Sequence, residues 1–302
     1  LDLLDVADAN RIPTHSYYHG GAITRGVVHV MQRSTVAAAN SRAYAAIFKR
    51  LGAAVDVIPP VADISYFSST ALTDEDRAAI AELKRVHRLE GKTVVLHLGR
   101  VDPQKGQQDT IDTAKRVKDR LGARGTDVVF VIGGPPVSAA EEKRLRDRVA
   151  AHGLREGEDV IFVGNQTREQ SRRWEAIAAL GVYPSRWVEP FGLVSTELQG
   201  MGKPVIVTNV GGLPETLQDG VTGVVVTKGN VEQLADAILA LVSDPAKLEA
   251  MGRAAEQYIH SEYEPTRAIR RYEESYVKAV LLNREGRAVP SRSVPSDLNE
   301  VL

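Results

Sequence analysis

The stretch that decides the fold runs from Pro184 to Gly223 and reads PSRWVEPFGLVSTELQGMGKPVIVTNVGGLPETLQDGVTG. The pattern of an apolar strand ends where this stretch begins. A glycine turn at Phe191-Gly192 then starts a short helical pattern. Residues 204–210, PVIVTNV, then have the composition of a second strand. A strand followed by a helix and another strand predicts an α/β protein with a mainly parallel sheet, in which ligands bind outside the carboxyl ends of the strands.

Two carboxylates flank the glycine turn, with seven residues between them. Glu189 precedes the turn, and Glu197 lies on the predicted helix, whose free N–H groups suit a phosphate. A carboxylate accepts hydrogen bonds from paired sugar hydroxyls, so the two glutamates could hold two sugar rings, such as the ribose and hexose of a nucleotide sugar. The alternative is that Glu189 caps the turn and Glu197 is an ordinary solvated helix residue. The surrounding glycines and the two flanking strands favour the first interpretation.

The segment EPFGLVSTELQGMGKPVIVTNVGGLPE resembles the signature of the retaining nucleotide-sugar glycosyltransferases with the GT-B fold. That family includes bacterial α-mannosyltransferases and sucrose- and trehalose-forming synthases. The resemblance extends from about Val55 to Tyr276. It implies an α/β, GT-B-like fold of two Rossmann-like lobes and a hexose transfer that needs no metal and no cofactor besides the nucleoside diphosphate sugar. It also implies that Glu189 holds the donor hexose and Glu197 the ribose, beside three further substrate-binding residues: Phe191, Gly192 and Leu193.

The loop after the predicted strand at residues 92–100 carries two cations, Arg100 and Lys105, around the bend Asp102-Pro103. Arginine can bind phosphate oxygens through two parallel hydrogen bonds, and lysine supplies a point charge. In the resembled family, an arginine and a lysine at this spacing bind the donor diphosphate. The alternative from the pattern alone is a solvated turn with two surface cations.

Two more strand ends carry glycines that let a backbone approach a ligand closely. The resemblance places the nucleotide base near these turns, which contain Gly133, Gly134, Val163 and Gly164. It also implies that His19 faces the donor sugar, although a lone histidine beside two tyrosines is more often structural. The catalytic residues expected on this basis are Glu189, Arg100, Lys105 and His19.

The acidic triplet Asp74-Glu75-Asp76 is similar to the metal-binding triplet of other glycosyltransferases. It falls in the first turn of a predicted helix that Thr73 could cap, where acidic residues complement the helix dipole. We therefore interpret it as a helix start and predict no metal site.

Alternating strand and helix patterns define three segments. Residues 1–91 predict a partial amino-terminal, acceptor-side lobe of about three strands, in which residues 27–52 form a strand and then a helix. Residues 92–262 predict a complete nucleotide-sugar-binding domain, and residues 263–302 a closing helix and a tail packed on the first lobe. About a hundred further residues before Leu1 would complete the first lobe.

The 302 residues are 43% apolar and 25% charged, carry a net charge of −1 and include no cysteine. This balance gives no sign of a nucleic-acid partner, and no apolar run is long enough to cross a bilayer. The lack of cysteine is compatible with a cytoplasmic location. The leading hypothesis is a glycosyltransferase with a nucleotide-sugar donor and a small-molecule or glycan acceptor. The rival is a nucleotide-sugar-binding module that lacks turnover because its first lobe is truncated. The oligomeric state is left open.

Overall fold

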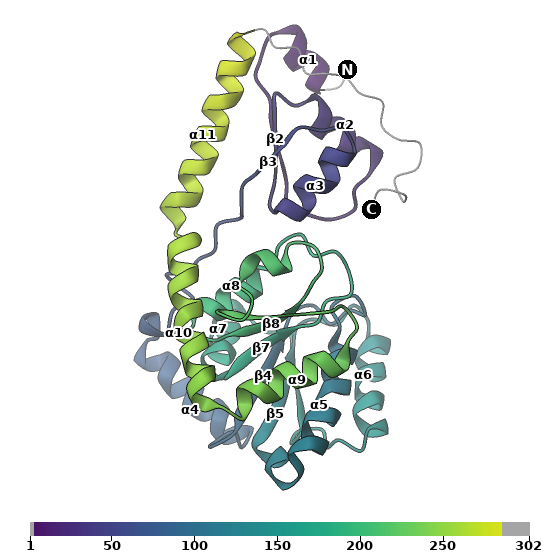
Figure 1. Ribbon diagram of the computed structural model, residues 1–302, viewed down its shortest axis with the longest axis vertical. Helices are drawn as coiled ribbons and strands as arrows, with labels where there is room; N and C mark the ends of the chain where they lie inside the picture. The colour runs from purple at the N-terminus through teal and green to yellow at the C-terminus, as the bar shows by residue number, and fades with distance from the viewer. Residues whose placement is uncertain (1–2, 286–302) are drawn as a thin grey trace. The chain divides into compact units, whose positions relative to one another are not determined.

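The computed structural model describes residues 3–285 and divides into two compact units (Figure 1). Among the described residues, the first unit comprises 3–62, Glu189–Phe191 and 263–285, and the second comprises Asp63–Val188 and Gly192–Glu262. The division at Ala62 differs from the expected boundary at residue 91.

The second unit is built on a six-stranded sheet in the order β6-β5-β4-β7-β8-β9, with all neighbouring strands parallel. The order reverses between β4 and β7, which is the topological switch point of a Rossmann-like sheet. The sheet confirms the expected parallel α/β architecture. Its strands are β4 (Thr93–Leu98), β5 (Val128–Gly133), β6 (Val160–Gly164), β7 (Leu180–Tyr183), β8 (Val205–Thr208) and β9 (Gly223–Val226).

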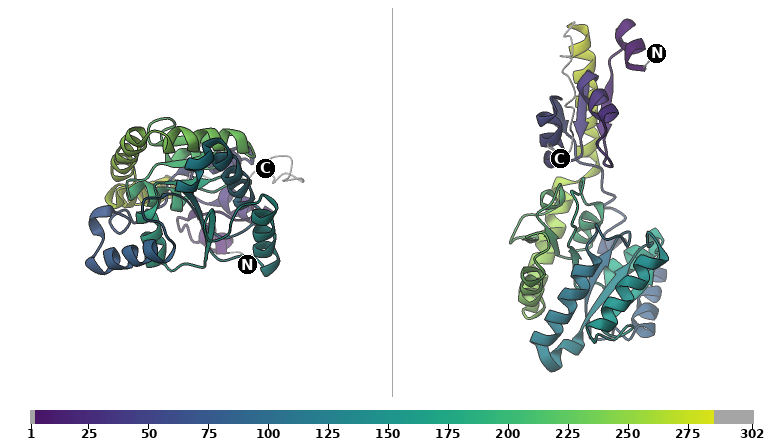
Figure 2. Two further views of the ribbon diagram at one scale, coloured as in Figure 1. Left: turned by 90° about the horizontal axis from the view of Figure 1, so that it is seen from below. Right: turned by 90° about the vertical axis from the view of Figure 1, so that its right-hand side faces the viewer.

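Helices cover both faces of this sheet (Figure 2), so its strands are apolar on both sides. One core contains Ile111 of α5, Leu145 of α6 and Leu234 of α9, and the other contains Trp174 of α7 and Leu198 of α8. The helices are α4 (Asp74–Val86), α5 (Gln107–Leu121), α6 (Ala139–Ala151), α7 (Arg168–Ile177), α8 (Leu193–Gly200), α9 (Val231–Val242) and α10 (Pro245–Glu262), with the short 3-10 turns η1 (Ser69–Ala71), η2 (Gly122–Asp127) and η3 (Leu213–Thr216).

The first unit has a three-stranded parallel sheet in the order β1-β2-β3. The expectation of a strand at the start of residues 27–52 is wrong, because residues 25–33 form helix α2. Thr24 caps that helix, and Val28 and Met31, three positions apart, are its buried apolar residues. The elements are α1 (Leu3–Ala9), β1 (His15–Tyr18), α2 (Arg25–Arg33), β2 (Val36–Ala39), α3 (Arg42–Arg50), β3 (Val55–Val57) and α11 (Pro265–Arg284).

The acidic triplet begins helix α4, as predicted. The Thr73 side chain accepts from the Asp76 N–H, and the Asp76 carboxylate accepts from the Thr73 N–H. Asp76 also pairs with Arg172 and Arg173 of α7. These ion pairs and the packing of α4 on α7 explain why residues 63–91 belong to the second unit.

The predictions for the last residues of the chain, including the packing of the tail, fall on residues 286–302 and lie outside the described part. None of the helices within residues 3–285 combines the length and the apolar composition needed to cross a bilayer.

Candidate functional site

The loops after β4, β5 and β6 are joined by backbone hydrogen bonds at the carboxyl edge of the six-stranded sheet. The Gly99 N–H donates to the Gly133 carbonyl (2.9 Å), and the Gly134 N–H donates to the Gly164 carbonyl (2.7 Å). A Cβ atom on Gly134 would overlap the Gly99 carbonyl oxygen, and one on Gly133 would lie 2.7 Å from the Val163 side chain. Only glycine allows this approach. The structure therefore brings together the predicted residues Gly133, Gly134, Val163 and Gly164.

The two predicted phosphate-binding cations lie on the loop between β4 and α5. Arg100 Nη2 is 2.9 Å from Asp102 Oδ2, and the arginine side chain is 54% exposed. The Lys105 ammonium lies 5.4 Å from the centroid of the Trp187 ring, which belongs to the loop after β7. The Arg186 N–H also donates to the Gln104 carbonyl (2.7 Å), so the β4 and β7 loops are joined at the switch point.

An ion pair between the half-exposed Arg186 and the buried Asp109, which the sequence did not suggest, joins the loop after β7 to the start of α5. Arg186 makes two hydrogen bonds of 2.8 and 2.5 Å to Asp109, whose side chain is 2% exposed. His97 of β4 is also buried. Its Nδ1 lies 2.8 Å from Oγ1 of Thr110, the residue after Asp109, and burial lowers the pKa of His97 to about 3. Arg186 and Asp109 are 77 positions apart in the sequence, so no local pattern could predict their contact.

The turn predicted to bind phosphate starts helix α8. Gly192 is the N-cap in a left-handed conformation (φ 118°), with no side-chain hydrogen bond to the first turn. A Cβ on Gly192 would lie 2.6 Å from Leu213 Cδ2, while the next residue, Leu193, is 43% exposed. The first N–H groups of a helix have no intrahelical partner and lie at the positive end of its dipole. This helix end follows β7, on the same sheet edge as Arg100.

Glu197 lies on α8 and is not an ordinary solvated residue. Burial raises its pKa to about 7, with Arg168 lowering it and Asp63 raising it. Within residues 3–285, its carboxylate has neither a hydrogen-bond nor an ion-pair partner. A carboxylate without a partner in the protein can accept hydrogen bonds from the hydroxyls of a ligand.

A second carboxyl group lies near Glu197 and was not anticipated. Glu175 of α7 is fully buried, and neither of its oxygens has a hydrogen-bond partner in the described part of the chain. Burial, followed by the charge of Glu197, raises the Glu175 pKa well above its usual range. The burial of Glu175 could not be predicted from the sequence, because a glutamate in the middle of a helix is usually exposed.

The remaining predicted residues belong to the first unit. Glu189 is 8% exposed. Burial, together with the Glu189 charge, raises the pKa of Tyr44 to about 12. The Phe191 ring lies 5.5 Å from Tyr263, and a Cβ on Gly20 would overlap Pro190. The Glu189–Phe191 segment therefore packs beside the turn that follows β1.

His19 lies in that same turn, and its side chain is exposed. Its ring makes an edge contact with Tyr17 at 4.3 Å between centroids. Its carbonyl oxygen accepts from Asn40 Nδ2 (2.8 Å). The backbone at His19 is thus held in place, while the imidazole remains accessible to a ligand.

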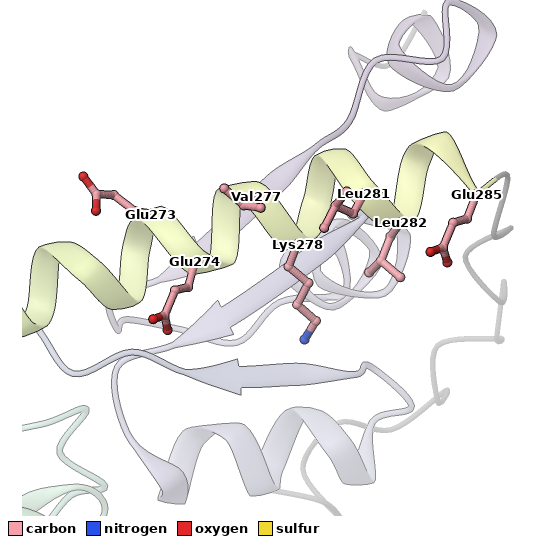
Figure 3. A pocket seen from close by; sticks show the side chains of 7 residues that line it. All are labelled: Glu273, Glu274, Val277, Lys278, Leu281, Leu282 and Glu285. Carbon is pink, nitrogen blue, oxygen red and sulfur yellow. The ribbon is translucent and has the colours of Figure 1, made fainter.

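Two further features of the structure bear on other types of site. Within residues 3–285, no three His, Asp or Glu side chains are grouped as metal ligands. An open hollow of about 520 Å³ runs along α11 in the first unit (Figure 3), and none of the predicted residues lines it. Its Lys278 pairs with Asp56 (2.6 Å). The hollow is lined by Glu273, Glu274, Val277, Lys278, Leu281, Leu282 and Glu285.

Comparison with known proteins gives a consistent match. The family model described as "Glycosyl transferases group 1" matches residues 79–258. The chain is 32% identical over 213 residues to the GDP-mannose-dependent alpha-(1-6)-phosphatidylinositol monomannoside mannosyltransferase of Mycobacterium tuberculosis, covering 68% of this chain and 53% of that protein. It is 34% identical over 209 residues to the D-inositol 3-phosphate glycosyltransferase of Kribbella flavida, covering 68% and 47%. The chain spans about half the length of these curated relatives.

The structure of HepE from Anabaena in complex with UDP and glucose superimposes with a TM-score of 0.78 at 22% identity, covering 91% of this chain and 74% of that one. This likeness confirms the GT-B fold. The family model covers more than half of the sequence, including the loop of Arg100 and Lys105 and the turn of Gly192 and Glu197. The chain therefore belongs to the group 1 glycosyltransferases.

Proposed function

We propose that the protein transfers a hexose from a nucleoside diphosphate sugar to an acceptor hydroxyl, with retention of the anomeric configuration. The observation that carries the proposal is the meeting of two loops at the switch point of the sheet. One loop presents Arg100 and Lys105. The other continues to Gly192 and to Glu197 on α8. Together they supply groups for the diphosphate and for the ribose attached to it.

The cations act on the leaving group. When the bond between the anomeric carbon and the diphosphate oxygen breaks, negative charge develops on that oxygen. Arg100, Lys105 and the amino end of α8 are arranged to stabilise this charge in advance. Arg100 exchanges its pairing with Asp102 for the phosphate, which its exposed position allows. We propose that no metal or organic cofactor is needed, since these groups neutralise the diphosphate.

The two glutamates have different roles. Glu197 accepts hydrogen bonds from the ribose hydroxyls, and Glu189 from the donor hexose. His19 contributes on the sugar side. The acceptor oxygen attacks the anomeric carbon on the face from which the diphosphate departs. The acceptor proton passes to the departing phosphate oxygen, so that retention requires no enzyme nucleophile.

Membership of a transferase family favours this function over a binding module without turnover. The acceptors named for the relatives, phosphatidylinositol monomannoside and D-inositol 3-phosphate, both carry several hydroxyls. We infer a small-molecule or glycan acceptor of this polyol type. The cysteine-free chain suits a reducing compartment, and we place the activity in the cytoplasm.

The test uses the chain of residues 1–302 with a panel of nucleoside diphosphate sugars and polyol acceptors. Release of the nucleoside diphosphate and the anomeric proton signal of the product by NMR report transfer and its stereochemistry. Glu197→Ala is expected to weaken binding of the bare nucleotide, whereas Glu189→Ala spares that binding and impairs transfer. Tight donor binding without turnover for every acceptor would favour the binding module, and an inverted product would contradict retention.

A further inference from the structure

An arginine that the proposed reaction does not use lies beside the nucleoside end of the site. Arg168 is the first residue of α7 and follows the turn that ends β6. Its guanidinium pairs with Asp63 and lies 4.3 Å from the centroid of the Tyr66 ring. The side chains of Arg168 and Asp63 are 53% and 46% exposed. The guanidinium is thus held from two sides and still open to a ligand.

The aromatic support is itself anchored by a buried ion pair. The Arg172 guanidinium lies 4.1 Å from the centroid of the same Tyr66 ring, and its Nη1 donates to the Tyr66 carbonyl (3.4 Å). Arg172 pairs with Asp76, and these two side chains are 8% and 3% exposed. Side chains fixed by packing and hydrogen bonds lose little freedom when a ligand binds, which favours selective recognition.

The hydrogen bonds around Arg168 determine what it can recognise. Asp63 Oδ1 accepts from Ser65 Oγ (3.0 Å) and from the Tyr66 N–H (3.3 Å), while Oδ2 accepts from Arg168 Nη2. The carboxylate is therefore engaged in orienting the arginine. Among residues 3–285, Nε and Nη1 of Arg168 donate no hydrogen bond to an acceptor. Because a guanidinium can only donate hydrogen bonds, the exposed N–H groups of Arg168 can bind only an acceptor.

Arg168 lies next to the turn where the resemblance to nucleotide-sugar glycosyltransferases places the nucleotide base. Arg168 and Glu197, the residue proposed to hold the ribose, each shift the pKa of the other. Arg168 also follows the Val163-Gly164 turn, where the base is expected. A base attached to a ribose on Glu197 and directed toward this turn meets the free N–H groups of Arg168.

We propose that Arg168 reads the base of the donor nucleotide and selects the oxo bases uracil and guanine over cytosine and adenine. This inference rests on the proposed function. A carbonyl oxygen on the base edge accepts from the guanidinium. An exocyclic amino group at the same position would place its N–H donors against those of the guanidinium and leave both groups unpaired. A site that recognises its ligand by hydrogen bonds discriminates strongly against such a mismatch.

The experiment compares nucleotides that differ by this one group. Titration calorimetry of the chain of residues 1–302 measures the ratio of affinities for UDP over CDP and for IDP over ADP, and the more tightly bound pair is used. The expected ratio is about tenfold or more, as one charge-assisted hydrogen bond allows. Arg168→Met is expected to weaken the oxo nucleotide about tenfold, leave the amino nucleotide unchanged, and bring the ratio near one.

Arg253→Met is the matched control, because Arg253 forms an exposed ion pair with Glu249 on α10; it should keep the wild-type ratio. Arg168→Lys keeps a donor but loses the planar guanidinium, and it should give an intermediate ratio. It replaces Arg168→Met in the test if that variant fails to fold. The inference is overturned if the wild type binds the two members of the pair equally, or if Arg168→Met retains the ratio. Absence of any nucleoside diphosphate binding would instead overturn the proposed function, and this inference with it.

Discussion

The carbonyl oxygen of Pro184 fills the space that a side chain on Gly106 would occupy. Gly106 is the N-cap of α5 in a left-handed conformation (φ 82°), and Pro184 directly follows β7. The loop of Arg100 and Lys105 therefore touches the loop after β7 through bare backbone. The placement of both cations depends on this contact at the switch point.

Gly106→Ala is expected to destabilise the protein strongly, because it adds an overlap to the cost of a left-handed alanine, roughly 1–3 kcal/mol. Gly153→Ala is the control, since Gly153 has a similar conformation (φ 66°) but no atom within 4 Å of the added Cβ. Urea unfolding should show a clearly larger loss for position 106. Equal losses at the two positions would mean that the loops separate without cost.

Removing Arg100 or Lys105 should weaken the binding of ligands that carry phosphates more than the binding of ligands without them. Arg100→Ala and Lys105→Ala are expected to weaken nucleoside diphosphate binding by about 1.5–3 kcal/mol each, the worth of a charge-assisted hydrogen bond, and to leave nucleoside binding nearly unchanged. Lys115→Ala, which removes an α5 cation paired with Asp119, is the control. Equal losses for the nucleoside and the diphosphate, measured by calorimetry, would contradict a phosphate-binding role.

Local patterns in the sequence predicted most of the second unit. The strand at residues 93–98, the helix beginning after Thr73 and the glycine turn at Gly192 all lie where they were expected. Each is encoded within a few neighbouring residues, by apolar runs, a capping side chain or a glycine. The parallel order then places the strand ends of this unit, and the residues predicted there, on one edge.

Contacts between distant residues could not be predicted in this way. Arg186 meets Asp109 across 77 positions, and Arg168 meets Asp63 across 105. Helix α2 was mistaken for a strand because Val27, Val28 and Val30 have strand propensity, which packing of one helical face overrides. The burial of Glu175 is likewise set by the packing around α7, not by its neighbours in sequence.

The raised pKa of Glu197 predicts a pH-dependent affinity. Only the ionised carboxylate accepts from two ribose hydroxyls, and its pKa is about 7. Lowering the pH from 8 to 6 reduces the ionised fraction, and with it the affinity for a nucleoside, by about tenfold. A nucleoside is used so that no phosphate titrates. Glu197→Gln should bind weakly with a flat profile, and a flat profile in the wild type would exclude this role.

The acidic triplet offers a test of its structural role. Asp76→Asn weakens the cap of α4 and the pairing with Arg172 and Arg173, and leaves the buried Arg172 guanidinium without its charged partner. The expected loss of unfolding free energy is about 3–5 kcal/mol, as for other broken buried pairs. Asp74→Asn, at a fully exposed position, should cost little. A chelator should change neither value; a stability loss on chelation would instead indicate a bound metal.

Glu175 should be a source of instability that grows with pH. Its carboxyl is fully buried without a hydrogen-bond partner in the described residues, and its pKa is raised well above 4.5. In the unfolded chain the group ionises above about pH 4.5, whereas in the folded protein it stays protonated. Folding therefore takes up a proton above that pH, and the stability contributed by the protonated form is lost as the pH rises toward the folded pKa.

Glu175→Met replaces this carboxyl by an apolar side chain of similar size, and we expect it to stabilise the protein. The gain in unfolding free energy should be small at pH 5 and reach on the order of 1–3 kcal/mol at pH 8, measured by urea denaturation. Glu249→Met, at an exposed position on α10, should show no such trend. Because the Glu197 charge contributes to the raised pKa, the pH-dependent part of the gain should shrink in a Glu197→Gln background. A gain that is equal at both pH values would show that Glu175 is not protonated in the folded protein.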